Sequence, residues 1–248
     1  MREAFEAPTA LENRFILDLM DRHLGGLADT QILDLGCGLG ESSTYFALRG
    51  ARVTATDVSG HMLRVTSAVA GLHGVRVRTS LASAERLPFR SGSFDAVYIA
   101  NAIHHLPRHE DLFREMHRVL RPGGWFFSWD PLAYNPVINL YRRMATEVRT
   151  EDEEPLRFET LKRAKQWFPE TRFRSFWIAT LALFIKYYLV DRIHPNDERY
   201  WKLIYRETEG SLRWWRPLVL ADRLLTRIPG VRALAWNIVL WGRKEQKK

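Results

Sequence analysis

A glycine-rich turn at residues 36–40 is the first place where residue types and spacing indicate chemistry. The segment Ile32–Glu41 is an apolar run followed by glycines in the pattern G-x-G-x-G. Glycine adopts backbone conformations closed to other residues and lets a ligand approach the main chain closely. In open α/β sheets, such a turn at the carboxyl end of a strand binds ligands. The pattern therefore predicts a small-molecule site at Gly36, Gly38 and Gly40.

Charged residues beside this turn indicate which kind of ligand it favours. A dinucleotide fingerprint would have a third glycine where this chain has Glu41. A carboxylate there would repel a pyrophosphate at the helix N-terminus, whereas Asp34 and Glu41 tolerate a cationic ligand. Asp57 follows the turn by about twenty residues, and one carboxylate can accept both hydroxyls of a ribose. We interpret Asp57 as that acceptor.

Apolar runs alternate with helical patterns through the first 130 residues. An amphipathic helix is expected over 9–24, with Thr9 and Glu12 in a capping-box spacing. Strand patterns and helix patterns then follow each other, which predicts a parallel sheet with right-handed crossovers. The expected strands are 31–35, 53–56, 75–79, 94–100 and 125–129, the last after a turn at 122–124, and the expected helices are 41–48, 61–72 and 109–120.

The pattern becomes less regular after residue 130. Residues 172–181 alternate well enough for a sixth strand, residues 184–229 favour helices, and residues 235–241 favour a closing strand. We expect a single domain, in which 1–130 form the ligand-binding core with its N-terminal helix. Residues 131–248 would add a substrate-side helical insertion and the closing strands of the same sheet.

Residues 30–130 resemble the class I S-adenosylmethionine-dependent methyltransferases, in the small-molecule branch that includes the ubiquinone and menaquinone biosynthesis methyltransferases. The resemblance implies S-adenosylmethionine as cofactor and S-adenosylhomocysteine as product. It also implies an α/β, Rossmann-like, doubly wound fold: a seven-stranded, mostly parallel sheet whose antiparallel last strand follows a helical insertion or lid. The strings that carry it are the glycine turn, Asp57, SAERLPF at 83–89, NAIHHL at 101–106 and RPGG at 121–124, in that order.

The resemblance also implies which residues contact the cofactor. The glycine turn would wrap the methionine part, Asp34 would support its amino group, and Met62 would lie against the adenine or simply in the core. Ser83 stands where the family usually has an aspartate, and a hydroxyl accepts a hydrogen bond from the adenine more weakly than a carboxylate. The expected cofactor-binding residues are Asp34, Gly36, Cys37, Gly38, Gly40, Asp57, Val58, Met62, Ser83, Ala84, Glu85 and Asn101.

Methyl transfer from a sulfonium is an in-line displacement, so the protein mainly positions the acceptor. Where a base is needed, His104 or His105 has a suitable intrinsic pKa, although both histidines can equally be structural. Tyr134 is expected to line the substrate pocket on a loop after the fifth strand. Cys37 is the only cysteine and stands in no metal-ligand spacing, so we interpret it as a small structural residue and expect no metal.

The second half of the chain differs in composition from the first. Residues 130–248 hold 23 basic against 15 acidic residues and seven of the nine tryptophans, whereas residues 1–129 are balanced at 14 of each charge. One interpretation is a lid whose cationic side chains over 176–232 lie at a membrane surface. Another is a helical subdomain with buried tryptophans and solvated arginines. Nucleic-acid binding, which uses the same residue types, is the least favoured of the three.

Three functions follow from these patterns. The first is methyl transfer to a small, hydrophobic or lipid-like acceptor, the second is an RNA methyltransferase, and the third is a cofactor-binding module without catalysis. No apolar stretch reaches about 18 residues and the N-terminus has no apolar leader region, so we expect a cytoplasmic protein, with membrane association left open. The sequence does not determine the oligomeric state.

Overall fold

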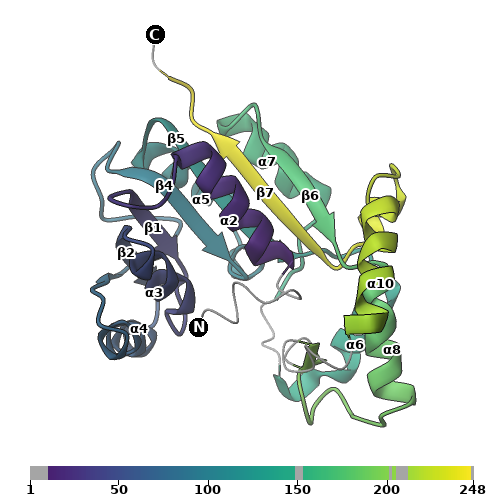
Figure 1. The fold of residues 1–248 in the computed structure, drawn as a ribbon. Coiled ribbons are helices and arrows are strands. Elements are labelled where there is room, and N and C mark those ends of the chain that lie inside the picture. Colours follow the sequence, from purple (N-terminus) through teal and green to yellow (C-terminus); the bar gives the residue numbers. More distant parts are fainter. Residues whose placement is uncertain (1–10, 149–152, 201–202, 205–211, 247–248) are drawn as a thin grey trace.

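A computed structural model of the chain describes residues 11–148, 153–200, 203–204 and 212–246. Seven strands form one sheet in the order β3-β2-β1-β4-β5-β7-β6 (Figure 1). Strands β1 to β5 are parallel, and β7 runs antiparallel to both β5 and β6. The strands are β1 Gln31–Leu35, β2 Arg52–Asp57, β3 Arg78–Leu81, β4 Phe94–Ala100, β5 Leu120–Pro131, β6 Arg172–Phe176 and β7 Asn237–Arg243. The predicted fold class, with its helical insertion before an antiparallel last strand, is confirmed.

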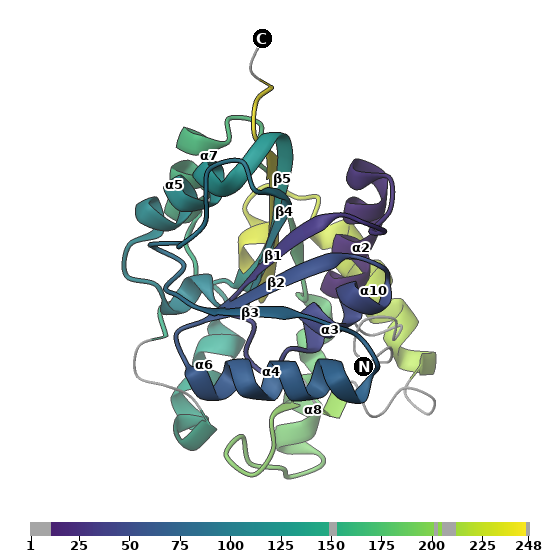
Figure 2. The same ribbon diagram turned by 90° about the vertical axis from the view of Figure 1, so that its left-hand side faces the viewer.

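Helices cover both faces of the sheet. Figure 2 shows α5 and α7 on one side and α2 and α3 on the other, while Figure 1 shows α6, α8 and α10 gathered past the carboxyl end of β6. None of the described helices is both long and apolar enough to cross a membrane. The helices are α2 Leu11–Leu24, α3 Glu41–Leu48, α4 Gly60–Leu72, α5 His109–Val119, α6 Pro136–Met144, α7 Phe158–Trp167, α8 Ala182–Leu189 and α10 Leu212–Leu225, with 3-10 turns at Ile103–His105, Thr146–Val148, Ala179–Leu181 and Val231–Leu234.

Two apolar clusters pack on the sheet, one on each face. Successive side chains of a strand point to opposite faces, so neighbours in sequence belong to different clusters. Phe127 of β5 packs with the α2 and α3 side chains, whereas the adjacent Phe126 packs with those of α5. Both phenylalanines are fully buried. A sheet covered on both faces explains why the strands are continuous apolar runs in the sequence.

Several element boundaries differ from the sequence predictions for local reasons. The third strand begins at Arg78 rather than 75, because the N–H of Val75 bonds to the carbonyl of Ala70 and closes α4. The expected turn at 122–124 lies within β5, where the register with β4 shifts between Phe94 and Ala96. The last strand is displaced by two residues, since its pairing with β5 and β6 starts at Asn237.

The sixth strand is shorter than expected and ends at Phe176. Trp177 has a φ of 69°, which turns the chain out of the sheet. The carboxylate of Asp222 in α10 then accepts the N–H groups of Ile178 and Ala179, at 2.9 and 2.5 Å. A distant helix therefore ends the strand, which the sequence pattern of 172–181 could not indicate.

The amphipathic helix predicted at the N-terminus is confirmed from residue 11, and Thr9 lies outside the described residues. Glu12, predicted as the partner of a cap, is instead buried and accepts a hydrogen bond from the Asn237 amide at 2.7 Å. Burial raises the pKa of Glu12 to about 7. This contact joins α2 to the last strand of the sheet.

Candidate functional site

The glycine turn between β1 and α3 has the backbone geometry that its sequence predicts. Gly36, Gly38 and Gly40 have φ values of 66°, 52° and 78°, in the left-handed region. A Cβ atom on Gly40 would lie 2.7 Å from the Cα of Thr66, and one on Gly36 would lie 2.9 Å from the Cβ of Ala102. A Cβ on Gly38 would have no neighbour within 4 Å. The outer two glycines are therefore required by packing, and Gly38 leaves space beside the main chain.

The carboxylate of Asp57 is fixed beside this turn at the end of β2. The backbone N–H of Gly38 donates to its Oδ2 at 3.0 Å, and the N–H of Ser59 donates to its Oδ1 at 2.8 Å. Ser59 also caps α4, because its hydroxyl accepts the N–H of Met62 at 3.4 Å. Val58 between them is 75% exposed. The sequence placed Asp57 correctly at the edge of the glycine turn.

Asp34 lies under the turn and is almost fully buried. Its Oδ2 accepts the hydroxyl of Ser43 at 2.5 Å. Burial, together with the nearby charge of Asp57, raises the pKa of Asp34 to about 7. A cation placed beside Asp34 would reverse this shift, because an opposite charge favours the ionised carboxylate.

Cys37 lies between Gly36 and Gly38 in the sequence, and its side chain is buried in the core. Its Sγ is 3.4 Å from the hydroxyl of Thr66, and burial raises the pKa of the thiol to about 12. A thiol in that state is a poor nucleophile, since the thiolate is the reactive form. The interpretation of Cys37 as a small structural residue agrees with this geometry.

The segment after β3 lies next to Asp57 along the same edge of the sheet. The N–H of Ala82 donates to the carbonyl of Asp57 at 3.1 Å, which brings the following residues alongside. The hydroxyl of Ser83 accepts the N–H of Glu85 at 3.2 Å. The Glu85 carboxylate accepts the N–H of Arg108 at 3.1 Å and so holds the loop before α5. Cofactor contacts at 83–85 stay a prediction.

A histidine and a buried aspartate meet where β4 and β5 end. The Nδ1 of His104 is 2.7 Å from the Oδ1 of Asp130, which also accepts the backbone N–H of His104 at 3.2 Å. Asp130 is fully buried, and its Oδ2 has no partner among the described residues. The rings of His104 and His105 lie 4.2 Å apart between centroids. Asn101, with a φ of 51°, precedes this pair and donates its N–H to Trp129 at 2.9 Å.

Asp130 was not identified from the sequence as the partner of His104. The sequence did contain a signal for this contact: both residues lie at the carboxyl ends of predicted strands, and the ends of adjacent parallel strands meet at one edge of the sheet. The hydroxyl of Tyr134 accepts the N–H of Phe158 at 3.0 Å, and the two rings stack at 5.4 Å. Tyr134 therefore holds the start of α7, and a role in the substrate pocket stays a prediction.

One group of described side chains has the geometry to hold a metal ion. His104, His105 and Glu153 each offer a ligand atom within 4.8 Å of the other two. The backbone N–H of Glu154 donates to the carbonyl of His104 at 2.8 Å, which keeps this segment beside the histidines. Two histidines and a carboxylate form a ligand set that zinc accepts. The sequence prediction of no metal did not consider Glu153, which lies far from the histidines along the chain.

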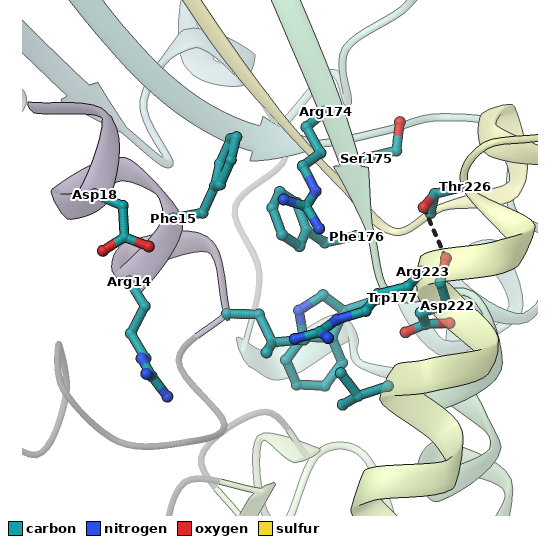
Figure 3. Close-up of a pocket in the computed structure, with 12 residues that line it drawn as sticks. Arg14, Phe15, Asp18, Arg174, Ser175, Phe176, Trp177, Asp222, Arg223 and Thr226 are labelled. Carbon is teal, nitrogen blue, oxygen red and sulfur yellow. Dashed lines mark hydrogen bonds between the residues drawn. The ribbon is translucent and has the colours of Figure 1, made fainter. Parts of the chain in front are cut away.

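A separate pocket of about 190 Å³ lies between α2, β6 and α10 (Figure 3). It contains none of the residues that the sequence predicted for cofactor or catalysis. Its walls combine aromatic side chains with arginines, namely Arg14, Arg174 and Arg223. The described residues thus form two separate candidate ligand sites, the carboxyl edge of the sheet and this pocket.

An open, mostly parallel sheet with a glycine turn after β1 and a carboxylate after β2 defines a Rossmann-like fold with a ligand site at its carboxyl edge. Residues 33–128 match a family model described as a methyltransferase domain. The ubiquinone biosynthesis O-methyltransferase of Chromobacterium violaceum is 35% identical over 116 residues, which cover 46% of this chain and 50% of that protein. A ubiquinone/menaquinone biosynthesis C-methyltransferase of the same organism is 36% identical over 126 residues, or 47% and 51% of the two chains.

Solved structures extend the likeness over nearly the whole chain at the level of fold. The YcgJ protein of Bacillus subtilis has a TM-score of 0.59 at 20% identity, covering 94% of this chain and 100% of that one. Geranyl diphosphate C-methyltransferase of Streptomyces coelicolor has a TM-score of 0.60 at 16% identity, covering 93% and 79%. The chain spans about half the length of the curated relatives it matches. The family model and the curated relatives confirm the resemblance to class I S-adenosylmethionine-dependent methyltransferases, and the solved structures show the fold.

Proposed function

We propose that this chain is an S-adenosylmethionine-dependent methyltransferase that acts on a small, hydrophobic or lipid-like acceptor and releases S-adenosylhomocysteine. The observation that carries the proposal is the fixed carboxylate of Asp57 beside the open side of Gly38. Backbone N–H groups hold its two oxygens at 3.0 and 2.8 Å. Each oxygen keeps a lone pair for one ribose hydroxyl. The family match over residues 33–128 supports the same cofactor.

The expected positions of the other parts of the cofactor follow from the order in which the parallel strands end along the sheet edge. The methionine part would lie along the glycine turn, with its ammonium beside Asp34, where a cation stabilises the ionised carboxylate. The adenine would lie between Met62 and Ser83, on the far side of Asp57. The sulfonium would then face the end of β4, where His104 and His105 follow Asn101.

The reaction is a displacement at the methyl carbon. A lone pair of the acceptor forms the new bond, the sulfur–methyl bond breaks, and its electron pair stays on sulfur to give neutral S-adenosylhomocysteine. An acceptor hydroxyl or carbon acid must also lose a proton. The Asp130 carboxylate at 2.7 Å from Nδ1 favours the tautomer that leaves Nε2 of His104 as the proton acceptor.

Replacing His104 with glutamine is expected to lower the turnover number about 10²-fold or more, the usual contribution of a general base, while cofactor affinity stays within about twofold. The assay follows transfer of label from S-adenosylmethionine into organic-soluble product, with a lipid-containing metabolite extract as acceptor. His73, exposed at the end of α4, provides the matched control His73→Gln, which should keep full activity.

The same assay tests the proposed function itself. Label in the organic phase that depends on His104 supports methyl transfer to a small acceptor. Label found only in RNA would show that the nucleic-acid alternative is correct. Cofactor binding without turnover on any fraction would favour the non-catalytic module instead.

We also propose that the insertion contacts an anionic membrane surface. Eight of the fourteen exposed large apolar side chains of the described residues lie between positions 185 and 234. Arg216 and Arg223 of α10 and Arg227 just after the helix are also exposed, and cations together with exposed apolar side chains suit an interface with anionic lipid. We call this set the α8–α10 surface: Ile185, Tyr188, Leu189, Val190, Leu220, Leu224, Ile228 and Leu234 with Arg216, Arg223 and Arg227.

Flotation with liposomes tests this contact. The wild type is expected to float with vesicles that contain anionic lipid and to remain at the bottom with neutral vesicles. The double substitution Leu220→Glu with Leu224→Glu should reduce the floating fraction at least about fivefold, because it adds charge to apolar positions that would enter the interface. Leu72→Glu, at an 87% exposed position on α4, is the control and should float normally. Equal flotation of all variants, or none of the wild type, would contradict the proposal.

A further inference from the structure

The pocket between α2, β6 and α10 is built from three elements that are distant in the sequence (Figure 3). Its α10 wall consists of Val219, Asp222 and Arg223, with Thr226 directly after the helix in the same helical turn. Their spacing of three, one and three residues puts them on one face of the helix. The exposed Leu220 and Leu224 of the α8–α10 surface lie on the adjoining face of the same helix. The pocket therefore lies beside that surface and shares Arg223 with it.

Arg174 of β6 is held in place by two aromatic rings. Its guanidinium lies 4.7 Å from the ring centroid of Phe15 and 5.2 Å from that of Phe176. Stacking of this kind fixes the plane of the guanidinium and leaves its N–H edges available for planar recognition of an anion. Among the described residues, no carboxylate forms an ion pair with Arg174 or with Arg223, which extends into the pocket from α10.

Neither of the two described carboxylates that line the pocket forms an ion pair with Arg174 or Arg223. Asp222 is 5% exposed, and its oxygens accept the N–H groups of Ile178 and Ala179 and the hydroxyl of Thr180, the last at 2.7 Å. Asp18 lies with Arg14 on the α2 side of the pocket (Figure 3). Neither carboxylate bonds to the arginine from β6.

Three further arginines repel the charge of Arg174. Burial lowers the pKa of Arg174, and repulsion from Arg223, Arg227 and Arg22 lowers it further. Repulsion between like charges costs free energy that a bound anion would offset. The arrangement therefore favours a negatively charged ligand.

Besides its charged and hydroxyl side chains, the pocket has an apolar part of the wall next to the arginines. Leu11, Phe15, Phe176, Trp177 and Val219 form this part of the wall. Leu11, Phe15 and Val219 are only partly buried, so an inorganic anion would leave them in contact with water, whereas an anionic group attached to a hydrocarbon chain would cover them. The lining thus matches an amphiphile with a negatively charged head.

We propose that this pocket binds the phosphate group of an amphiphile, with Arg174 and Arg223 donating to the phosphate oxygens and the apolar wall covering the first carbons of the chain. Bidentate arginine contacts to phosphate are strong and geometrically specific. The site is independent of the methyl-transfer chemistry proposed at the glycine turn, since the two share no residue.

Titration calorimetry with a water-soluble, short-chain phosphatidic acid below its micelle concentration tests the proposal. We expect one site per chain, with affinity at least about tenfold higher than for inorganic phosphate, since only the lipid covers the apolar wall. Arg174→Met and Arg223→Met should each weaken binding by about 10- to 100-fold, the range for hydrogen bonds to a charged group. Arg232→Met is the matched control: Arg232 stacks on Phe173 at 4.8 Å outside the pocket, so the variant loses the same charge and the same kind of contact.

Three outcomes would overturn the proposal. Equal weakening by Arg232→Met would show a general charge effect, and equal affinity for inorganic phosphate would show an anion site without a lipid preference. Binding to anionic vesicles but not to the monomeric lipid would show surface contact only. Thermal unfolding of each variant verifies that it folds. Because Arg223 is exposed, Arg223→Met tests the site without disturbing the rings that stack on Arg174. S-adenosylhomocysteine binding is measured in parallel, so failure of the methyltransferase proposal is seen separately.

Discussion

Replacing Asp57 with alanine is expected to weaken S-adenosylmethionine binding by at least about 100-fold. Each hydrogen bond from a ribose hydroxyl to a carboxylate contributes about 1.5–3 kcal/mol, and two of them are lost together. The substitution also removes the acceptor that holds the N–H groups of Gly38 and Ser59 at 3.0 and 2.8 Å. Titration calorimetry with S-adenosylmethionine and with S-adenosylhomocysteine measures the effect.

A carboxylate near the other end of α3 supplies the control, because its partner Arg49 follows the last residue of that helix. Asp21 is exposed on α2 and pairs with Arg49 at 3.3 Å, so Asp21→Ala changes charge by the same amount outside the site. It should bind cofactor within about twofold of wild type, because exposed ion pairs contribute little. Wild-type affinity in Asp57→Ala would contradict the assignment of the ribose acceptor.

Replacing Gly40 with alanine is expected to destabilise the protein by about 2–5 kcal/mol. A left-handed conformation costs a residue with a Cβ about 1–2 kcal/mol, and overpacking adds about 1–3. The φ of Gly40 is 78°, and a Cβ would lie 2.7 Å from the backbone of Thr66, which cannot move as a flexible side chain can. A fall in melting temperature of about 4–20 °C should be measured.

Gly38→Ala is the matched comparison, because it separates stability from binding. The φ of Gly38 is 52°, and a Cβ there would meet no atom within 4 Å. Stability should fall by only about 1–2 kcal/mol, from backbone strain alone. Cofactor binding should nevertheless drop at least tenfold, because the added methyl fills the space where the ligand approaches the main chain. A Gly38→Ala protein that binds normally would show that the ligand lies elsewhere.

Much of the fold could be predicted because local pattern and tertiary environment agree. Continuous apolar runs mark strands buried on both faces, and the glycine turn marks where the first strand ends. The predicted strand at 94–100 and helix at 41–48 have the observed bounds. Predictions were wrong where a distant group decides the outcome: Asp222 of α10 ends β6, and Glu12 bonds to Asn237, 225 positions away.

The candidate site could likewise be predicted from the sequence only in part. Gly38 and Asp57 belong to successive strand ends, so their spacing alone indicated that they meet. The contact between His104 and Asp130 could also have been found, since their strands are neighbours in the sheet. The pocket between α2, β6 and α10 could not be predicted, because these elements are far apart in the sequence and meet only through tertiary packing.

The most direct test of the cofactor assignment is a crystal structure of the chain with S-adenosylhomocysteine. We expect both ribose hydroxyls within hydrogen-bond distance of the Asp57 oxygens, the ammonium near Asp34, and the sulfur facing His104 and His105. The ligand bound at another edge of the sheet, or a ribose that does not contact Asp57, would contradict the assignment.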